Sequence, residues 1–131
     1  MKYLLDTHTL IWSISDTGKL SKKVKGALED SQNTIYASGI NFWEISLKFS
    51  LGKLALEKLM PENIPSLIEK MGFKILLPEA KEYSTFHQLP AHHRDPFDKM
   101  LIWQAIQQNL ILITKDENMH LYLSEGLKIL W

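Results

Sequence analysis

The sequence contains no cysteine, which excludes a disulfide framework and any zinc site built on thiolates. It also lacks an excess of charge of either sign, because 15 Lys and Arg residues balance 15 Asp and Glu residues. Overall charge therefore gives no support for nucleic-acid binding. A polyanionic ligand would have to meet a local patch of charge or a bound metal ion.

Long hydrophobic runs are missing as well. No apolar segment approaches the roughly 18 residues that suggest a membrane-spanning helix. The opening MKYLLDTHTL lacks the long apolar region of a signal peptide, because Asp6 interrupts it. Repeats and low-complexity tracts are also absent, and 131 residues is a usual length for one domain. We therefore expect a single domain over residues 1–131 that is soluble, cytoplasmic and without a membrane partner.

Short apolar segments alternate with longer amphipathic ones along the chain. Apolar segments without polar alternation are typical of strands buried on both faces, and strand–helix alternation favours a parallel sheet. The pattern predicts strands at residues 2–5, 34–37, 73–77, 110–114 and 127–130. It predicts helices at residues 7–15, 20–31, 39–51, 61–71, 79–88, 95–108 and 118–123. The expected fold class is α/β, a three-layer α/β/α arrangement around a central parallel five-stranded sheet.

Four acidic residues fall where these elements meet one edge of the predicted sheet. Asp6 directly follows the first strand, and Asp116 lies two residues after the fourth. Asp98 lies in the first turn of the helix that leads into the fourth strand. Glu44 lies one turn inside the helix that follows the second strand. Because open parallel sheets place their sites at the carboxyl ends of strands, we expect these carboxylates to converge there.

Converging carboxylates repel one another unless a cation holds them together. Hard divalent ions such as Mg²⁺ and Mn²⁺ take oxygen ligands, usually a few carboxylates together with water and substrate phosphate. Such an ion can activate water and offset charge on a phosphodiester. The acidic pattern therefore favours a hydrolytic nuclease.

Each aspartate also has a purely structural explanation. Asp95 precedes Pro96 and fits the N-cap of a helix with proline at its first position. Asp98 would favour the dipole of the same helix. Asp116 could cap the last helix, and either Asp6 or its neighbour Thr7 could cap the first.

Glu44 is the most informative of the acids. At helical spacing it shares a face with Ile40, Leu47 and Leu51, where a carboxylate is costly unless it is paired. The structural alternative to a functional role is an ion pair with Lys48, four residues further along the helix.

Several histidines, one arginine and four aromatic residues are weaker markers. His8, on the first predicted helix, could contact substrate or could be structural. The cluster of His92, His93 and Arg94 could contact phosphate or form a solvated loop, and its spacing does not fit a zinc site. The aromatic side chains on amphipathic helices are more typical of a core or a dimer surface than of base stacking; they are Trp12, Phe42, Trp43 and Trp103.

Four segments of the chain together resemble a known family. LLDTHTLIW, WEISLK, HRDPFDKMLIWQA and LILITKDE are similar to signature segments of PIN-domain toxins of the VapC type, in order and at the expected spacing. The resemblance implies a Mg²⁺- or Mn²⁺-dependent endoribonuclease that hydrolyses RNA with metal-activated water. It also implies a homodimer, and a type II toxin–antitoxin pair in which a cognate antitoxin neutralises the enzyme.

The resemblance assigns the acidic quartet of the family to Asp6, Glu44, Asp98 and Asp116, as catalytic residues and metal ligands. It makes Asp95 an additional acid that assists them. The sequence departs from this branch of the family at Asn41, where serine is usual, at Lys99, where arginine is common, and at Trp103, where a small residue is usual. None of these departures removes an acid, but Trp103 bears on local packing and on the dimer surface.

Two other classes of function are compatible with an α/β chain that carries acids. A phosphorylation-controlled receiver domain would explain Thr114 and Lys115 after a late strand, but it requires an acidic pair after the first strand, where Asp6 stands alone. A non-catalytic PIN-fold module that binds RNA or protein is the main alternative, and the complete set of acids argues against it.

Overall fold

The computed structural model describes all 131 residues. The strands are β1 (Lys2–Leu5), β2 (Thr34–Ser38), β3 (Lys74–Leu76), β4 (Ile111–Ile113) and β5 (Lys128–Leu130). The α-helices are α1 (Thr7–Ser15), α2 (Lys22–Glu29), α3 (Gly39–Ser50), α4 (Ile64–Lys70), α5 (Ala80–Thr85) and α6 (Pro96–Gln108). Four 3₁₀ segments join them: η1 (Thr17–Lys19), η2 (Pro61–Asn63), η3 (Phe86–Gln88) and η4 (Glu117–Glu125).

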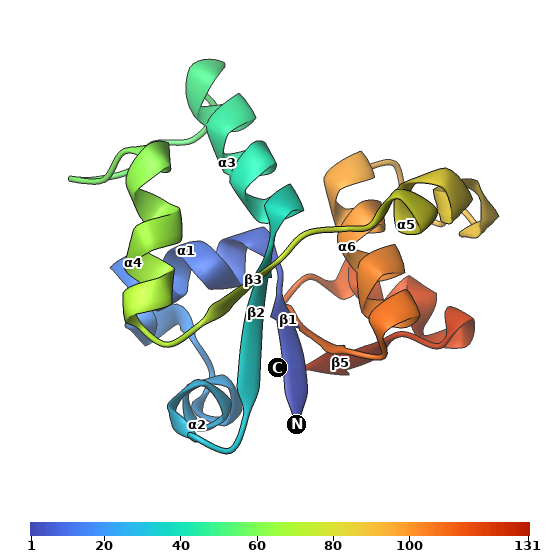
Figure 1. Ribbon diagram of the computed structural model, residues 1–131, viewed down its shortest axis with the longest axis horizontal. Coiled ribbons are helices and arrows are strands. Elements are labelled where there is room, and N and C mark those ends of the chain that lie inside the picture. The colour runs from blue at the N-terminus through green and yellow to red at the C-terminus, as the bar shows by residue number, and fades with distance from the viewer.

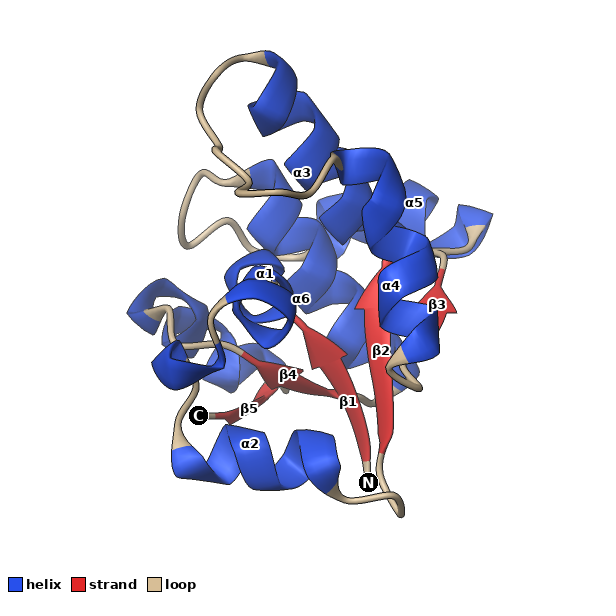
Figure 2. Ribbon diagram, turned by 90° about the vertical axis from the view of Figure 1, so that its left-hand side faces the viewer, coloured by secondary structure: helices blue, strands red, loops and turns tan.

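The five strands form one sheet in the order β3-β2-β1-β4-β5, and every neighbouring pair is parallel. Helices α1, α2 and α4 lie on one side of the sheet and α5 and α6 on the other (Figure 1). In Figure 2, β1 and β2 run from the N-terminus toward α3, which stands beyond the carboxyl ends of the strands. The predicted three-layer α/β fold is confirmed.

Two hydrophobic clusters fill the space between the layers. Leu4 and Leu112 point from the sheet into a cluster built mainly on α6, which includes the fully buried Leu101 and Ile102. Residues of the opposite sheet face, such as Leu5, contribute to a second cluster with the helices α1 to α4. Successive strand residues therefore serve opposite cores, which is why the strands show no polar alternation.

The elements occur in the predicted order, with different bounds at several ends. The helix predicted over residues 61–71 is a 3₁₀ turn followed by α4, because Pro65 has no N–H and fits only the first turn of an α-helix. The helix predicted over residues 20–31 begins later, since Ser21 caps it by accepting a hydrogen bond from Val24 N. The segment predicted as a helix over residues 118–123 is the longer 3₁₀ segment η4.

The strand order decides between the fold classes left open by the sequence. Receiver domains have the order 2-1-3-4-5, whereas this sheet has the order 3-2-1-4-5. The receiver interpretation is therefore wrong. In this order the direction of winding reverses between β1 and β4, and the crevice outside the carboxyl ends of these two strands is where open α/β sheets bind their ligands.

No helix of the structure combines the length and the apolar character needed to cross a lipid bilayer.

Candidate functional site

Asp6 lies at the switch point, directly after β1. Its backbone N–H donates to Ile113 O of β4 at 3.1 Å, so the two strand ends are tied together. One carboxylate oxygen accepts from Thr9 N at 2.8 Å and caps α1, and the other accepts a hydrogen bond from the Thr114 hydroxyl. Burial raises the pKa of Asp6 above its ordinary value, although the hydrogen bonds from Thr114 and Thr9 oppose the shift.

Thr114 couples Asp6 to Asp116. The hydroxyl that donates to Asp6 also accepts from Asp116 N, at 3.1 Å, and Thr114 is fully buried. The carboxylate of Asp116 caps η4 by accepting from Asn118 N at 2.9 Å. The capping roles considered for Asp6 and Asp116 are therefore both realised, and the same contacts bring the two acids to one edge.

Glu44 projects from α3 with only 3% of its surface exposed. Thr7 Oγ1 donates to its Oε1 at 2.5 Å, and the Lys48 ammonium forms an ion pair with Oε2. The ion pair that the spacing offered is thus confirmed. The prediction that Glu44 shares a buried apolar face with three residues is only partly correct, because Ile40 is buried whereas Leu47 and Leu51 are exposed.

The charged form of Lys48 is stabilised by Glu44 and by two other acids. Burial alone would lower its pKa, but the hydrogen bond and charge of Glu44, with further attraction from Asp95 and Asp98, raise it above the ordinary value. Its ammonium therefore remains charged and supplies positive charge beside the five clustered acids, which we call the acidic edge: Asp6, Glu44, Asp95, Asp98 and Asp116.

Asn41 joins three elements around Glu44. Its Oδ1 accepts from Ser38 N at 2.7 Å, in a capping box at the start of α3. Its Nδ2 donates to Leu5 O at 3.2 Å and to Thr7 Oγ1 at 3.1 Å. The Thr7 hydroxyl thus has its own proton free for Glu44. Asn41, a departure from the resembled family, is a fully buried clamp between β1, α1 and α3.

Asp95 and Asp98 stand at the start of α6. Asp95 caps the helix, accepting from Phe97 N at 2.9 Å and from Asp98 N at 3.1 Å. Burial, reinforced by the negative charges of four other acids, raises the pKa of Asp98 to about 8. These acids are Asp95, Glu44, Asp116 and Asp6, in order of decreasing effect. The acids predicted from sequence are therefore gathered within electrostatic reach of one another.

The residues predicted to contact substrate lie around these acids in different ways. His93 is largely buried, with Nε2 at 3.4 Å from Asp98 Oδ2. His8 and Arg94 are exposed. His8 shares an open pocket of about 460 Å³ with Asp6, Trp12, Lys115, Asp116 and Glu117, which we call the acid pocket.

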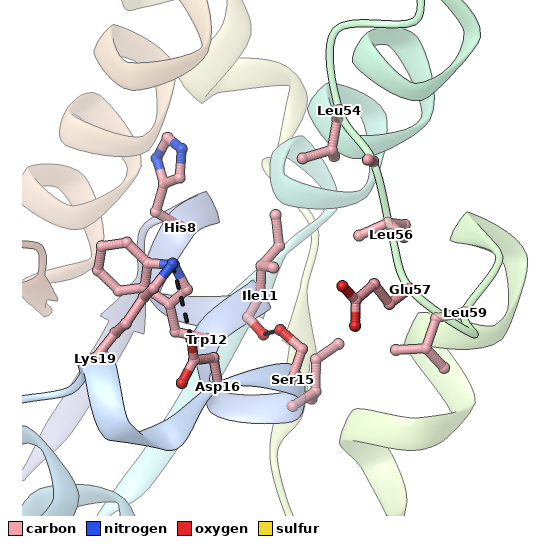
Figure 3. A pocket seen from close by; sticks show the side chains of 12 residues that line it. His8, Ile11, Trp12, Ser15, Asp16, Lys19, Leu54, Leu56, Glu57 and Leu59 are labelled. Atoms are coloured by element: carbon pink, nitrogen blue, oxygen red, sulfur yellow. Dashed lines mark hydrogen bonds and ion pairs between the residues drawn. The ribbon is translucent and has the colours of Figure 1, made fainter.

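A second pocket adjoins the acid pocket. It has a volume of about 330 Å³ and lies between α1 and the loop of residues 54–59, whose side chains face one another in Figure 3. Its lining is mostly apolar and includes Ile11, Leu54 and Leu56. His8 and Trp12 line both pockets, so this α1 groove continues into the acid pocket.

The donor set of the acidic edge fits a hard divalent cation. Five carboxylates from four parts of the chain lie within electrostatic reach of one another, and ionising Asp98 among them is unfavourable without added positive charge. No three histidine, aspartate or glutamate side chains approach closely enough to form a ready coordination shell. Glu44 contributes to the lack of such a shell, because both of its carboxylate oxygens already accept hydrogen bonds, one from Thr7 and one from Lys48.

Of the partners of the acids, the sequence predicts only Lys48, through its spacing from Glu44. It presents Asn41 as a departure from the family, Thr114 as a feature of a receiver domain and Thr7 as a cap, and none of these three as the partner of an acid. The available signal was position, because Thr7 and Thr114 each follow a strand end by one or two residues. Tyr122, fully buried and bonded to His93 through its hydroxyl, carried no such signal.

The aromatic residues divide between core and surface. Trp43 is 61% exposed, whereas Trp103 is buried and donates from Nε1 to Thr85 Oγ1 at 3.2 Å. The indole of Trp103 therefore contributes to the packing of α6 against α5, and its bearing on a dimer surface stays a prediction.

Comparison with known proteins identifies a family and a fold. Residues 3–122 match the PIN domain family. No curated protein sequence matches the chain significantly. Among solved structures, a chain of VapBC2 from Rickettsia felis, bound to a promoter DNA fragment, superposes with a TM-score of 0.70 at 20% identity, over 99% of this chain and 98% of that one.

Two further structures are similar over nearly their whole length. DNA-bound VapBC from Salmonella typhimurium gives a TM-score of 0.70 at 18% identity, covering 99% of this chain and 97% of that one. VapBC-5 from Mycobacterium tuberculosis, of the VapBC family of toxin–antitoxin systems, gives 0.62 at 12% identity, covering 98% and 97%. At these identities the likeness establishes the shared fold.

Proposed function

Because the chain belongs to the PIN domain family, we propose that it is a metal-dependent endoribonuclease, the VapC-type toxin of a type II toxin–antitoxin pair. The observation that carries the proposal is the gathering of five carboxylates at the switch point of the sheet, where burial and then the charges of the other four acids raise the pKa of Asp98 to about 8. Such a cluster is costly for folding alone, and it suits the binding of a cation.

In this proposal the acids bind the metal ion and the basic side chains around them contact the RNA. Asp6, Glu44, Asp98 and Asp116 would hold Mg²⁺ or Mn²⁺, and Asp95 would add charge beside them. When bound, such an ion lowers the pKa of water and offsets the charge that grows on a phosphodiester. His8 and Lys115 line the acid pocket and, together with the exposed Arg94, would contact the RNA phosphates. His93, whose ring nitrogens meet Tyr122 and Asp98, would act on the site through Asp98.

Replacing Asp6 by asparagine tests the nuclease assignment. Asp6→Asn keeps the size of the side chain and removes the charge that a hard cation needs, so we expect no RNA cleavage and an unchanged circular dichroism spectrum. Asp30→Asn is the matched control, since exposed Asp30 precedes the amino end of β2, opposite the site. Two further measurements on the wild type test the metal and the mechanism. A chelator should abolish the cleavage of RNA, and the cleaved products should carry 5′-phosphates. Cleavage in excess EDTA, or 2′,3′-cyclic phosphate ends, would overturn the proposal.

An antitoxin partner is supported by the two adjoining pockets. A partner segment seated on the apolar α1 groove could extend past His8 and place an arginine among the carboxylates, displacing the cation.

The toxin would act in the cytoplasm, and its expression should arrest bacterial growth. The Asp98→Ala variant should relieve the arrest. Undiminished arrest in that variant would show that toxicity is not nucleolytic.

Two observations favour a non-catalytic RNA- or protein-binding module as the second candidate. Lys48 already neutralises Glu44, and no ready coordination shell exists. Calorimetric titration with Mn²⁺ separates the two functions, because a non-catalytic module should show no binding.

A homodimer is also part of the proposal. Trp43 and Leu47 of α3 and the C-cap residue Leu51 form an exposed apolar row, spaced one turn apart, which a second copy of the chain would cover. Sedimentation velocity of the wild type and of Leu47→Glu tests this arrangement. A wild type that sediments as a monomer would contradict it.

A further inference from the structure

Tyr122 makes an unusual set of hydrogen bonds. Its side chain is fully buried, yet its hydroxyl meets three nitrogens of the loop before α6. The backbone N–H groups of His92 and His93 donate to it, at 3.0 Å and 3.2 Å. The third contact is His93 Nδ1, at 2.8 Å, the shortest of the three.

Counting donors and acceptors determines the direction of the third bond. A backbone N–H can only donate, so the two from His92 and His93 occupy the lone pairs of the hydroxyl oxygen. The hydroxyl proton is then left for His93 Nδ1, which must accept it. A neutral imidazole with an accepting Nδ1 carries its own proton on Nε2. That proton faces Asp98 Oδ2, 3.4 Å away.

We propose that Tyr122 and His93 form a positioning relay for Asp98, in which the tyrosine hydroxyl selects the Nε2–H form of His93 and this N–H holds Oδ2 of the carboxylate. His93 is the only residue that hydrogen-bonds to the carboxylate of Asp98, and Oδ1 is left free for a cation. Helix α6 fixes the backbone of Asp98, and the relay fixes the rotation of its carboxylate. The consequence for metal binding rests on the proposed function, whereas the selection of one tautomer does not.

The tautomer is measured by long-range ¹H–¹⁵N correlation spectra of the metal-free protein at about pH 8, above the ordinary titration range of histidine. We expect His93 to show a protonated Nε2 and an unprotonated Nδ1. In Tyr122→Phe the selecting proton is gone, and both tautomers should be populated. His92 is an internal control, because its ring nitrogens make no bond to the hydroxyl. A protonated Nδ1 in the wild type, or an unchanged tautomer in Tyr122→Phe, would overturn the relay.

The positioning effect is measured by Mn²⁺ calorimetry of His93 variants, which leave Tyr122 itself in place. We expect His93→Ala to weaken Mn²⁺ binding about tenfold, as is usual when a partner of a metal ligand is removed. His93→Gln supplies a side-chain N–H at a similar reach and should stay close to the wild type. His92→Ala is the matched control and should bind normally.

The outcomes separate the relay from the function on which it depends. Equal affinity in His93→Ala and the wild type, or equal loss in His93→Gln and His93→Ala, would overturn the positioning role. A wild type that binds no Mn²⁺ would refute the proposed function, and the tautomer spectra would then decide the relay alone.

Discussion

Three aspartates of the acidic edge cap a helix and face the other acids at the same time. Asp6, Asp95 and Asp116 each accept hydrogen bonds from the first N–H groups of α1, α6 and η4. The first turn of a helix carries partial positive charge, which favours a carboxylate there. The structural and functional explanations of these residues are therefore compatible, because capping is what holds each charge at the site.

Asp95 allows capping and charge to be separated. Asparagine caps a helix as well as aspartate does, so Asp95→Asn should change the free energy of unfolding by less than about 0.5 kcal/mol. It removes the negative charge that acts most strongly on Asp98, so the pKa of Asp98 should fall from about 8. Carboxyl ¹³C titration of the metal-free protein measures this shift.

Asp95→Ala serves as the comparison, since it removes the charge and the cap together. It should lower the pKa of Asp98 in the same way and also cost about 1 kcal/mol of stability. An Asp98 pKa that is the same in all three proteins would show that the charge of Asp95 is screened.

Lys48 provides a second prediction for a single residue. Lys48→Met keeps the length of the side chain but leaves the buried carboxylate of Glu44 with Thr7 as its only hydrogen-bond partner. Removing one member of a buried pair costs up to about 3–5 kcal/mol, but water reaches the 33% exposed lysine. We therefore expect a loss of about 1–3 kcal/mol in urea unfolding with chelator present. Lys48→Arg should lose less, and equal stability of Lys48→Met and the wild type would contradict the prediction.

At the scale of the elements, the order and type of most helices and strands could be predicted because their hydrophobic periods differ. The ends were harder, since they depend on local hydrogen bonds. Pro65 is a boundary that the sequence displays openly, because a residue without an N–H belongs in the first turn. The 3₁₀ form of η4 had no comparable signal, since its apolar spacing also suits an α-helix.

The same contrast holds for the site. The acids could be predicted because they follow strands or begin helices, and parallel strands end at one edge. Lys48 could be predicted as the partner of Glu44 from its spacing along the helix. Thr114 could not be predicted as the partner of Asp6, because the two are 108 residues apart and threonine is a common residue in strands. The hydrogen bond of Tyr122 to a histidine 29 residues away is of the same kind. Such pairs become visible only once the chain is folded.

At the scale of the whole molecule, the raised pKa of Asp98 makes stability depend on pH. The unfolded chain loses this proton near 3.8 and the folded protein near 8, so between these values the folded form binds more protons. The contribution of Asp98 to the free energy of unfolding is fully present below the lower pKa. It declines as the pH rises and is lost once the pH has passed the upper pKa. Buried Asp6 acts in the same direction.

The metal-free protein should therefore melt at a lower temperature at about pH 8 than at about pH 5. Differential scanning calorimetry in chelator measures the difference. Asp98→Asn is the control, and its melting temperature should vary less over this range. Identical pH profiles for the two proteins would exclude Asp98 as the source. Added Mn²⁺ should raise the wild-type melting temperature most at the higher pH, where its ligands are ionised.

The position of β1 in the centre of the sheet has a consequence for synthesis. β1 to β3 leave the ribosome early and can pair with one another, but β1 lacks its other neighbour until β4 is made. Thr114 and Asp116 arrive with that last part of the chain, so the acidic edge is completed only at the end of translation. A chain that stops at Asn109 should show no cleavage at any Mn²⁺ concentration. On the proposed function, this order of synthesis would keep the enzyme inactive toward the ribosome and the messenger RNA that are still producing it.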